Sequence, residues 1–375
     1  MKKKKLQNFD SLLLYSVLAL LIFGVLVIYD VSVVLAHDVF GGKYYFLFLQ
    51  IAWVAFGLLG LSLGYRTSFT VIKKLSLPLF IGSLISLIFV LLPSPFSPLI
   101  YGARRWVYLN PDPFPLIPFI GRLGFQPSEF VKLAFILYFS MFLVKKKEVS
   151  PAQFVLLVGL IVGFVMLQPD LGTALLISGT AMIMYFLSGA KLSYFMLGIP
   201  LGALLVFLLI FSSAYRRERL ITYLGLKKSD PQGSSYHINQ IMIALGSGGV
   251  FGLGFGESRQ KYQYIPEVAT DSIFAIIGEE LGFFGVLVLI SSFAFIIYRG
   301  FRIALLSDDA YQRLLGSGIT SAFAIQCFVN LAAMVHLIPL TGVPLPLISY
   351  GGSSMVFGLS GIGILLNISR NNKRL

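Results

Sequence analysis

Ten long apolar runs decide what this chain can fold into. Each spans about 16 to 27 residues, which brackets the ~20 that a helix needs to cross ~30 Å of hydrocarbon. Hydrophobic residues make up 57% of the chain and charged residues only 12%, so a water-soluble domain cannot bury this much apolar surface. The sequence predicts an all-α integral membrane protein, with residues 1–375 forming one bundle of about ten transmembrane helices. The apolar runs cover residues 12–36, 44–63, 75–92, 127–144, 152–168, 171–187, 192–213, 272–298, 314–338 and 347–368.

The same composition excludes a cytosolic enzyme, a nucleic-acid-binding protein and a secreted disulfide scaffold. A net charge of +13 would indicate nucleic acid in a soluble protein, but positively charged loops explain it on a membrane protein. The single cysteine, Cys327, allows no internal disulfide. No histidine or cysteine cluster has the spacing of metal ligands. We therefore expect no nucleic-acid partner and no metal site built by the chain alone.

The distribution of lysine and arginine predicts the orientation in the membrane. An even number of spans places both termini on one side. If that side is the cytoplasm, the inside segments carry 17 lysines and arginines, whereas the short outside loops carry only Lys43. Cytoplasmic segments are the ones that carry such an excess. We expect both termini in the cytoplasm and two long loops, about 93–126 and 214–271, outside.

Both long outside loops are basic. Arg104 and Arg105 lie in the first, and Arg259 and Lys261 lie in the second. Long ordered loops are usually functional, so these cations predict an anionic ligand at the outer membrane surface. Attraction to anionic lipid headgroups is the alternative explanation.

A glycine-rich stretch follows a short apolar segment in the second loop. The segment contains Gln240 and is too short to span the membrane, so it is read as a re-entrant or interfacial helix. Gly248 and Gly249 belong to the stretch 246–256, whose free N–H groups could cradle a phosphate. A flexible hinge is the competing interpretation.

Five charged residues lie within or beside the apolar runs, where charge is costly. Glu129 and Lys132 are three residues apart on one helix face, so we expect them to pair, either as a structural contact or around a polar cavity. Glu279 and Glu280 point about 100° apart, so at most one should face a given partner. Asp30 lies near the outer end of the first run and can reach the interface.

Two similar sequences, QPSE from Gln126 and QPDLGT from Gln168, each open an apolar run. A helix start explains the proline and the acid, but not the glutamine. The final loop, PLTGVPLPLISYGGSS, includes Ser353 and brings proline and glycine to membrane depth. Such backbone must be buried in protein or line a cavity. We expect the last span to border an outward-facing cavity.

Two carboxylates, Glu267 and Asp271, stand at the mouth of the eighth apolar run. Asp271 is placed to cap the helix that follows. A carboxylate at headgroup depth near basic residues is also suited to act as a general base. The sequence leaves both roles open.

These motifs together resemble the SEDS family (shape, elongation, division and sporulation), whose branches include FtsW and RodA. The resemblance covers essentially the whole chain. YHINQ and PLTGVPLP resemble the RodA branch, whereas GARRW, SRQKYQYIPE and GILLNISR resemble FtsW, which we favour. The chain departs from the family at Ala269 and Ser272, where histidine and phenylalanine are usual. The matching motifs are GARRW at 102–106, QPSE at 126–129 with Lys132, QPDLGT at 168–173, YH at 236–237 with Gln240, GSGG at 246–249, IPE at 265–267 with TD at 270–271, GEELG at 278–282 and SYGGSS at 349–354.

The resemblance implies a peptidoglycan glycosyltransferase of the bacterial cytoplasmic membrane, with its active site on the outer face. Such proteins polymerise lipid II during division or elongation, and their partner is a class B penicillin-binding protein, the transpeptidase. Asp271 matches the family's essential aspartate. Residues expected to contact the substrate are Arg104, Arg105, Gln240, Gly248, Gly249, Arg259, Lys261, Glu267 and Ser353, and those expected to shape the cavity are Gln126, Glu129, Lys132, Gln168 and Glu279.

The chemistry of lipid II fits these residue types. The growing chain is a donor on a polyprenyl pyrophosphate, a leaving group that gains charge and needs cations or N–H groups. The 4-hydroxyl of the acceptor GlcNAc must lose a proton, which Asp271 would take. The α-linked donor becomes a β1,4 link, so the step inverts. A divalent cation, Mg or Mn, bridging pyrophosphate and carboxylate is chemically reasonable.

Two other functions are compatible with this sequence. A lipid II flippase would also bury charges such as Glu129, Lys132 and Glu279 in its spans, although its alternating access usually comes with repeated halves, and none is evident. A non-catalytic scaffold that recruits and activates the penicillin-binding protein is the second alternative.

Overall fold

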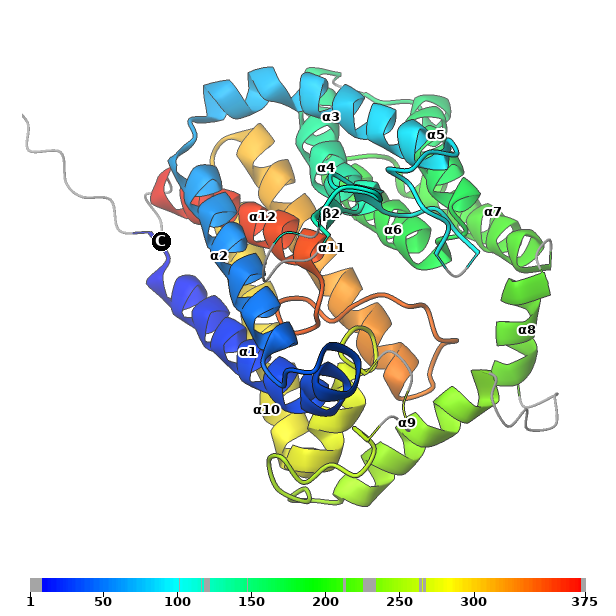
Figure 1. Ribbon diagram of the computed structural model, residues 1–375. Helices are drawn as coiled ribbons and strands as arrows, with labels where there is room; N and C mark the ends of the chain where they lie inside the picture. The colour runs from blue at the N-terminus through cyan, green and yellow to red at the C-terminus, as the bar shows by residue number, and fades with distance from the viewer. Residues whose placement is uncertain are drawn as a thin grey trace, which may run out of the picture.

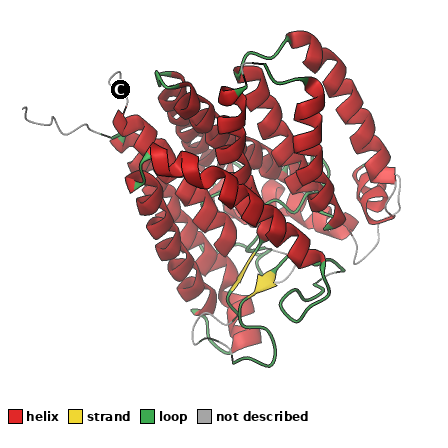
Figure 2. Ribbon diagram, turned by 90° about the horizontal axis from the view of Figure 1, so that it is seen from above, coloured by secondary structure: helices red, strands yellow, loops and turns green. Residues whose placement is uncertain are grey.

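A computed structural model describes residues 9–371 except 101, 116, 118–121, 147, 212–213, 225–233, 263–264 and 266–267. It is a helical bundle with a single two-stranded ribbon among the described residues (Figures 1 and 2). The elements are α1 (Ser11–Phe40), α2 (Tyr45–Arg66), α3 (Phe69–Leu91), β1 (Val107–Tyr108), β2 (Gly124–Phe125), α4 (Pro127–Lys145), α5 (Pro151–Leu167), α6 (Leu171–Leu187), α7 (Leu192–Phe211), α8 (Ala214–Tyr223), α9 (Ser234–Gly248), α10 (Ile273–Leu305), α11 (Ala310–Met334) and α12 (Gly352–Asn371).

A helix lies at each of the ten apolar runs, so the predicted all-α membrane fold is confirmed. Eight of these helices are long and apolar enough to cross a membrane, and the 17-residue helices α5 and α6 are shorter. The last run differs from its prediction at its start. Its helix begins at Gly352 rather than near 347, because Leu347 has a φ of +66°, a conformation that no helix accepts.

Local sequence explains where the helices begin. Asp10, Asp170 and Asp309 each accept a hydrogen bond from a first-turn N–H group and so cap α1, α6 and α11. Pro127 and Pro151 open α4 and α5, where the missing N–H costs nothing. The glutamine, proline and acid motifs therefore do mark helix starts.

Helices α11 and α12 form the centre of the bundle. Figure 1 shows α1, α2 and α10 on one side of them and α3 to α7 on the other. In an 18-residue apolar stretch of each helix, 72% of α12 is buried, against 6% of α7. The side chains of α7 would therefore face lipid. Small residues let α2 and α12 approach closely: a Cβ on Gly363 would stand 2.1 Å from Leu61 O.

Hydrogen bonds and an ion pair show which connecting segments lie together at each end of the bundle. We call one the loop end, where the 93–126 loop contacts the α5–α6 turn and Ala269 O accepts from Tyr350 N at 2.8 Å. We call the other the terminal end. There Asp10 N donates to Ser369 Oγ at 3.0 Å, and Lys73 lies 3.6 Å from Asp309. The first and last described helices thus meet at this end of the bundle.

Candidate active site

Asp271 lies two residues before α10 and does not cap it. The N-cap residue is Ser272, and no side-chain hydrogen bond caps the helix there. Asn330 Nδ2 on α11 donates to the backbone carbonyl of Asp271 at 2.9 Å, and Thr270 Oγ1 donates to Asp271 Oδ1 at 3.3 Å. Of the two roles that the sequence left open, helix capping is therefore not supported.

The proline- and glycine-rich segment 339–351 packs beside Asp271. Asn330 Nδ2 also donates to Val343 O at 2.8 Å, so one amide holds this segment and Asp271 together. A Cβ on Gly342, whose φ is +73°, would stand 3.8 Å from Asp271 Oδ2. This placement agrees with the expectation that irregular backbone here borders the site.

Gln168, Asn330 and Thr341 together carry four buried side-chain atoms that have no hydrogen-bond partner within the described residues. They are Gln168 Nε2 and Oε1, Asn330 Oδ1 and Thr341 Oγ1. The turn that carries Gln168 adjoins the segment, because a Cβ on Gly172 would stand 3.2 Å from Thr341 O. Buried polar groups are nearly always paired, so these atoms are candidates to meet polar groups of a ligand. We call Asp271, Gln168, Asn330 and Thr341 the Asp271 cluster.

Arg105 stabilises the backbone beside this cluster, and Arg104 stabilises its own loop. Arg105 Nε donates to Gln168 O at 2.9 Å, and its Nη2 donates to Pro169 O at 2.8 Å. Arg104 Nη1 donates to Ser97 O within its own loop. A guanidinium has five N–H donors, so these bonds leave each arginine with donors that an anion can use.

The glycine-rich stretch does not form the open phosphate cradle that the sequence suggested. The N–H of Gly252 donates to Gly248 O at 2.8 Å, and that of Gly254 donates to Glu280 O at 3.0 Å. A Cβ on Gly248 would stand 2.1 Å from a backbone carbonyl of α10. These glycines let the loop lie against α10, which is broken at Gly282 with a φ of +64°.

Glu279 and Glu280 both bind this same loop. Ser258 Oγ donates to Glu279 Oε2, while its N–H donates to Glu280 Oε1 at 3.1 Å. The N–H groups of Arg259 and Gln260 donate to the Glu279 carboxylate at 3.2 and 3.3 Å. The expectation that only one glutamate faces a given partner is wrong, because residues 258–260 of the loop curve around α10 and reach both carboxylates.

Lys261 is buried between carboxylates. Its Nζ lies 2.7 Å from Asp30 Oδ1 on α1 and 3.4 Å from Glu280 Oε1. Burial alone would lower the pKa of Lys261, but hydrogen bonds and the negative charges of Asp30 and Glu280 outweigh it and raise that pKa. We call Asp30, Ser258, Lys261, Glu279 and Glu280 the Lys261 cluster. Its lysine, expected to bind pyrophosphate, is neutralised within the fold, and Asp30 pairs instead of reaching the interface.

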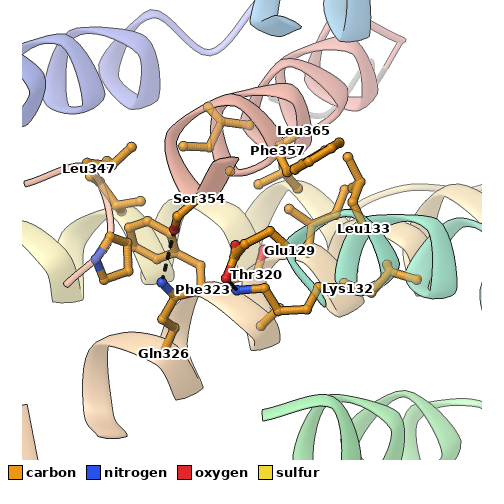
Figure 3. A pocket seen from close by; sticks show the side chains of 18 residues that line it. Glu129, Lys132, Leu133, Thr320, Phe323, Gln326, Leu347, Ser354, Phe357 and Leu365 are labelled. Atoms are coloured by element: carbon orange, nitrogen blue, oxygen red, sulfur yellow. Dashed lines mark hydrogen bonds and ion pairs between the residues drawn. The ribbon is translucent and has the colours of Figure 1, made fainter. Parts of the chain in front are cut away.

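The intramembrane pair Glu129 and Lys132 forms as predicted. The two charges are 2.7 Å apart, and Lys132 Nζ also donates to Gln326 Oε1 at 3.1 Å. They line a cavity of about 80 Å³ between α4, α11 and α12, which is otherwise mostly apolar (Figure 3). Gln326 Nε2 reaches across to Ser354 Oγ at 3.4 Å.

The other predicted residues are more dispersed. Gln126 N donates to Ser353 Oγ at 2.9 Å, which joins the starts of α4 and α12. Gln240 is half-buried in α9, the helix expected from the short apolar segment, and Gly249 follows that helix with a φ of +53°. Glu267 lies outside the described residues. Among the residues described, no group of three His, Cys, Asp or Glu could hold a metal ion.

Comparison with known proteins decides the family. The family described as "Cell cycle protein", which unites FtsW, RodA and SpoVE, matches residues 10–374. The chain belongs to the FtsW/RodA/SpoVE family. Probable peptidoglycan glycosyltransferase FtsW of Trichlorobacter lovleyi is 38% identical, with 99% of this chain and 96% of that protein covered. Stage V sporulation protein E of Bacillus subtilis is 36% identical, with 97% and 98% covered.

Solved structures of the FtsW/RodA/SpoVE family share the fold. A chain from a structure titled "Structural coordination of polymerization and crosslinking by a peptidoglycan synthase complex" superposes with a TM-score of 0.77 at 28% identity, covering 98% of this chain and 99% of that one. The rod shape determining protein RodA of Thermus thermophilus gives 0.69 at 27% identity, with 98% of both chains covered.

Sequence reasoning gave no role to Asn330, Thr341 or Ser258, and it placed Asp30 at the membrane interface rather than in a cluster. Asn330 and Thr341 join the Asp271 cluster, and Asp30 joins the Lys261 cluster. Asn330 does carry a signal in the sequence, because an amide inside an apolar run is itself unusual. Nothing local in the sequence pairs Asp30 with a residue 231 positions away.

Proposed function

We propose that this protein polymerises lipid II into glycan strands as a peptidoglycan glycosyltransferase. Curated relatives with this name match nearly the whole chain at 34–38% identity. The observation that carries the proposal is the position of Asp271, a carboxylate that does not cap its helix and lies beside buried polar atoms without partners. The FtsW names among these relatives also support the FtsW branch.

In the proposed reaction, Asp271 accepts the proton of the acceptor 4-hydroxyl as that oxygen attacks the donor's anomeric carbon. The bond to the pyrophosphate breaks on the opposite face, so the α-linked donor gives a β1,4 link. One base suffices for an inverting transfer with a good leaving group. Arg104, Arg105 and the exposed Arg259 are the cations proposed to meet the pyrophosphate. Lys261 is no longer among them.

A divalent cation is proposed as part of the substrate side of this reaction. Mg²⁺ binds phosphates together with one or two carboxylates and needs no cage of protein ligands, which suits pyrophosphate opposite Asp271. Titration with a chelator, followed by Mg²⁺ or Mn²⁺ addition, tests the requirement. Full activity after chelation would remove the cation from the proposal.

The decisive experiment places purified protein in liposomes with lipid II and no other enzyme. Glycan strands resolved by gel electrophoresis would support the polymerase. Translocation of lipid II without strands would indicate a flippase, and neither activity would indicate a scaffold. The Asp271→Asn variant in the same liposomes controls for a contaminating polymerase.

We propose that both termini face the cytoplasm and that the loop end lies outside. The charge asymmetry of the loops supports this orientation. A cysteine at Asp112, an exposed residue of the 93–126 loop, should react with an impermeant reagent applied to intact cells. A cysteine at Lys74 should react only after permeabilisation. The native Cys327 is buried and should stay silent. Labelling of position 74 from outside would invert the topology.

We further propose a class B penicillin-binding protein as the partner. The structural relative in a peptidoglycan synthase complex supports an assembly of this kind. Co-purification of a transpeptidase with the full-length protein from its own membranes tests it. Recovery of the protein without any penicillin-binding protein, under conditions that preserve its lipid II activity, would contradict it.

A further inference from the structure

A second cavity lies at the terminal end, far along the chain from Asp271. It measures about 220 Å³ and lies where α4 ends, α5 begins, α6 ends and α7 begins. Lys146 and Lys191 line it, together with the hydroxyl residues Ser150, Ser188 and Tyr194. None of these residues has a part in the proposed polymerase reaction.

The cavity has a packed floor. Tyr185 is 3% exposed, and its hydroxyl donates to Val149 O at 2.6 Å, which joins α6 to the segment before α5. Its ring stacks on Phe154 with centroids 4.6 Å apart. The turn above the floor passes through Gly189 with a φ of +93°. The hollow is therefore a feature of the packed helices rather than a gap between surface side chains.

The charge around this cavity is positive. Lys146 and Lys191 contribute two ammonium groups, and Glu148 is the one carboxylate that lines it. Within the described residues neither lysine has an ion-pair partner, in contrast to the buried Lys261. Hydroxyl groups beside two cations suit a phosphate, which accepts hydrogen bonds as well as attracting positive charge.

Apolar surface flanks the cavity. Leu156 on α5 and Leu192 and Met196 on α7 are among the most exposed apolar side chains of the protein. Figure 1 shows α5 and α7 at the edge of the bundle. A molecule with a phosphate head and acyl tails could therefore place its head in the cavity and its tails along these helices.

We propose that this cavity binds the headgroup of an anionic phospholipid, such as phosphatidylglycerol, from the leaflet at the terminal end. Basic pockets between transmembrane helices recognise anionic headgroups in this way. The exposed apolar helices beside the cavity favour a lipid over free phosphate. The site is independent of lipid II polymerisation and stands or falls separately from it.

The test titrates the full-length protein in detergent with dioleoyl phosphatidylglycerol and counts bound lipid by native mass spectrometry. Lys146→Gln combined with Lys191→Gln should weaken binding about tenfold or more, since each lysine near a headgroup contributes appreciably. The matched control, Lys43→Gln with Lys74→Gln, removes two exposed lysines elsewhere and should bind as the parent does. Equal loss in the control would reduce the effect to general surface charge and overturn the site.

A third variant separates the cavity from its charges. Ala190→Leu fills the hollow but keeps both lysines, so it should also weaken binding, while unchanged melting temperatures confirm that each variant folds. Parent-like binding by Ala190→Leu would overturn the cavity. Equally tight binding of dioleoyl phosphatidylcholine would overturn the preference for an anionic lipid. Displacement of the lipid by millimolar inorganic phosphate would assign the cavity to a free anion instead.

Discussion

The two polar clusters at the loop end differ in how far the chain satisfies them. In the Lys261 cluster, Lys261 lies between two carboxylates and Glu279 accepts from three successive residues. Among the described residues one buried side-chain atom of the Lys261 cluster, Asp30 Oδ2, has no hydrogen-bond partner, whereas four such atoms of the Asp271 cluster have none. A network in which almost every polar atom is paired stabilises one arrangement of the chain, whereas several unpaired polar atoms around a carboxylate suit a ligand. We infer that the first cluster is architecture and the second is the site.

The most direct way to break this comparison is Asp271→Asn. Asparagine keeps the shape of the side chain and removes its basicity. Because Asp271 does not cap α10, the variant should fold and melt like the parent. Loss of a general base typically costs about 10²- to 10⁴-fold in rate, so polymerisation in liposomes should fall by that factor. Near wild-type polymerisation would remove Asp271 as the base and make Glu267 the next candidate.

Substitution of Lys261 should produce the opposite outcome, a loss of stability. Lys261→Met leaves Asp30 and Glu280 facing each other without their cation, and removal of one partner of a buried pair costs about 3–5 kcal/mol. The measurement is the melting temperature and yield of the purified protein. Arg259→Met is the matched control, an exposed cation two residues away, and should weaken donor use at constant stability. A stable Lys261→Met protein with weakened donor use would restore Lys261 as a substrate contact.

The intramembrane ion pair between Glu129 and Lys132 offers a second test of how paired buried charges stabilise the fold. Glu129→Gln or Lys132→Met alone leaves one charge buried, whereas the double variant leaves none. Residues in direct contact usually couple by about 0.5–3 kcal/mol. Each single variant should therefore melt lower than the double variant. A double variant that is as harmful as the sum of the singles would show that the two residues act separately.

What the sequence could predict follows from which forces act locally. The helices match the apolar runs because each apolar residue favours lipid over water, and in lipid each backbone N–H and C=O group must be hydrogen-bonded within a helix. The Glu129–Lys132 contact was predictable because three residues of helix fix its geometry. The role of Lys261 was not, since a basic residue beside glycines has the same local sequence whether it faces water or a carboxylate on α1.

The glycine-rich stretch is a second case in which the local sequence does not reveal the distant contact. Glycines permit close backbone approach, but the sequence does not say what approaches. Here it is α10, whose carbonyl would meet a Cβ on Gly248 at 2.1 Å, and not a phosphate. For Asp271 the boundary of α10 argues against a capping role, because Ser272 is the N-cap residue, and its role as the general base stays a prediction.

Removal of an unmatched amide should be harmless to the fold and costly to the reaction. Gln168→Met replaces a buried amide without partners by an apolar side chain of similar size, which should leave the melting temperature unchanged or raise it. If the amide meets lipid II, polymerisation should fall several-fold, as expected for a hydrogen bond of about 0.5–1.5 kcal/mol. A lower melting temperature with normal polymerisation would show that Gln168 stabilises the fold and does not contact lipid II.

The smallest expected effect concerns His237, whose Nε2 lies 2.8 Å from Ser272 Oγ, next to Asp271. Burial, helped by the charge of Arg219, lowers its pKa to about 4. The imidazole is therefore neutral in the folded protein at pH 5.5–8. An unfolded histidine has a pKa near 6.5, so between pH 4 and pH 6.5 the unfolded chain binds more protons at this position than the folded protein does. The stability due to His237 is therefore present above about pH 6.5 and falls as the pH drops towards 4.

His237→Gln should therefore flatten the fall in melting temperature between pH 6.5 and 4.5, and leave the pH dependence of polymerisation above pH 5 unchanged. The flatter melting profile and the unchanged rate profile are both expected if Asp271 is the base that titrates in its cluster and His237 is only an uncharged neighbour. Melting curves and initial rates of parent and variant across this range measure the two effects together. Disappearance of a rate transition near pH 6–7 in the variant would instead show that His237 titrates with the substrate bound and belongs to the catalytic group.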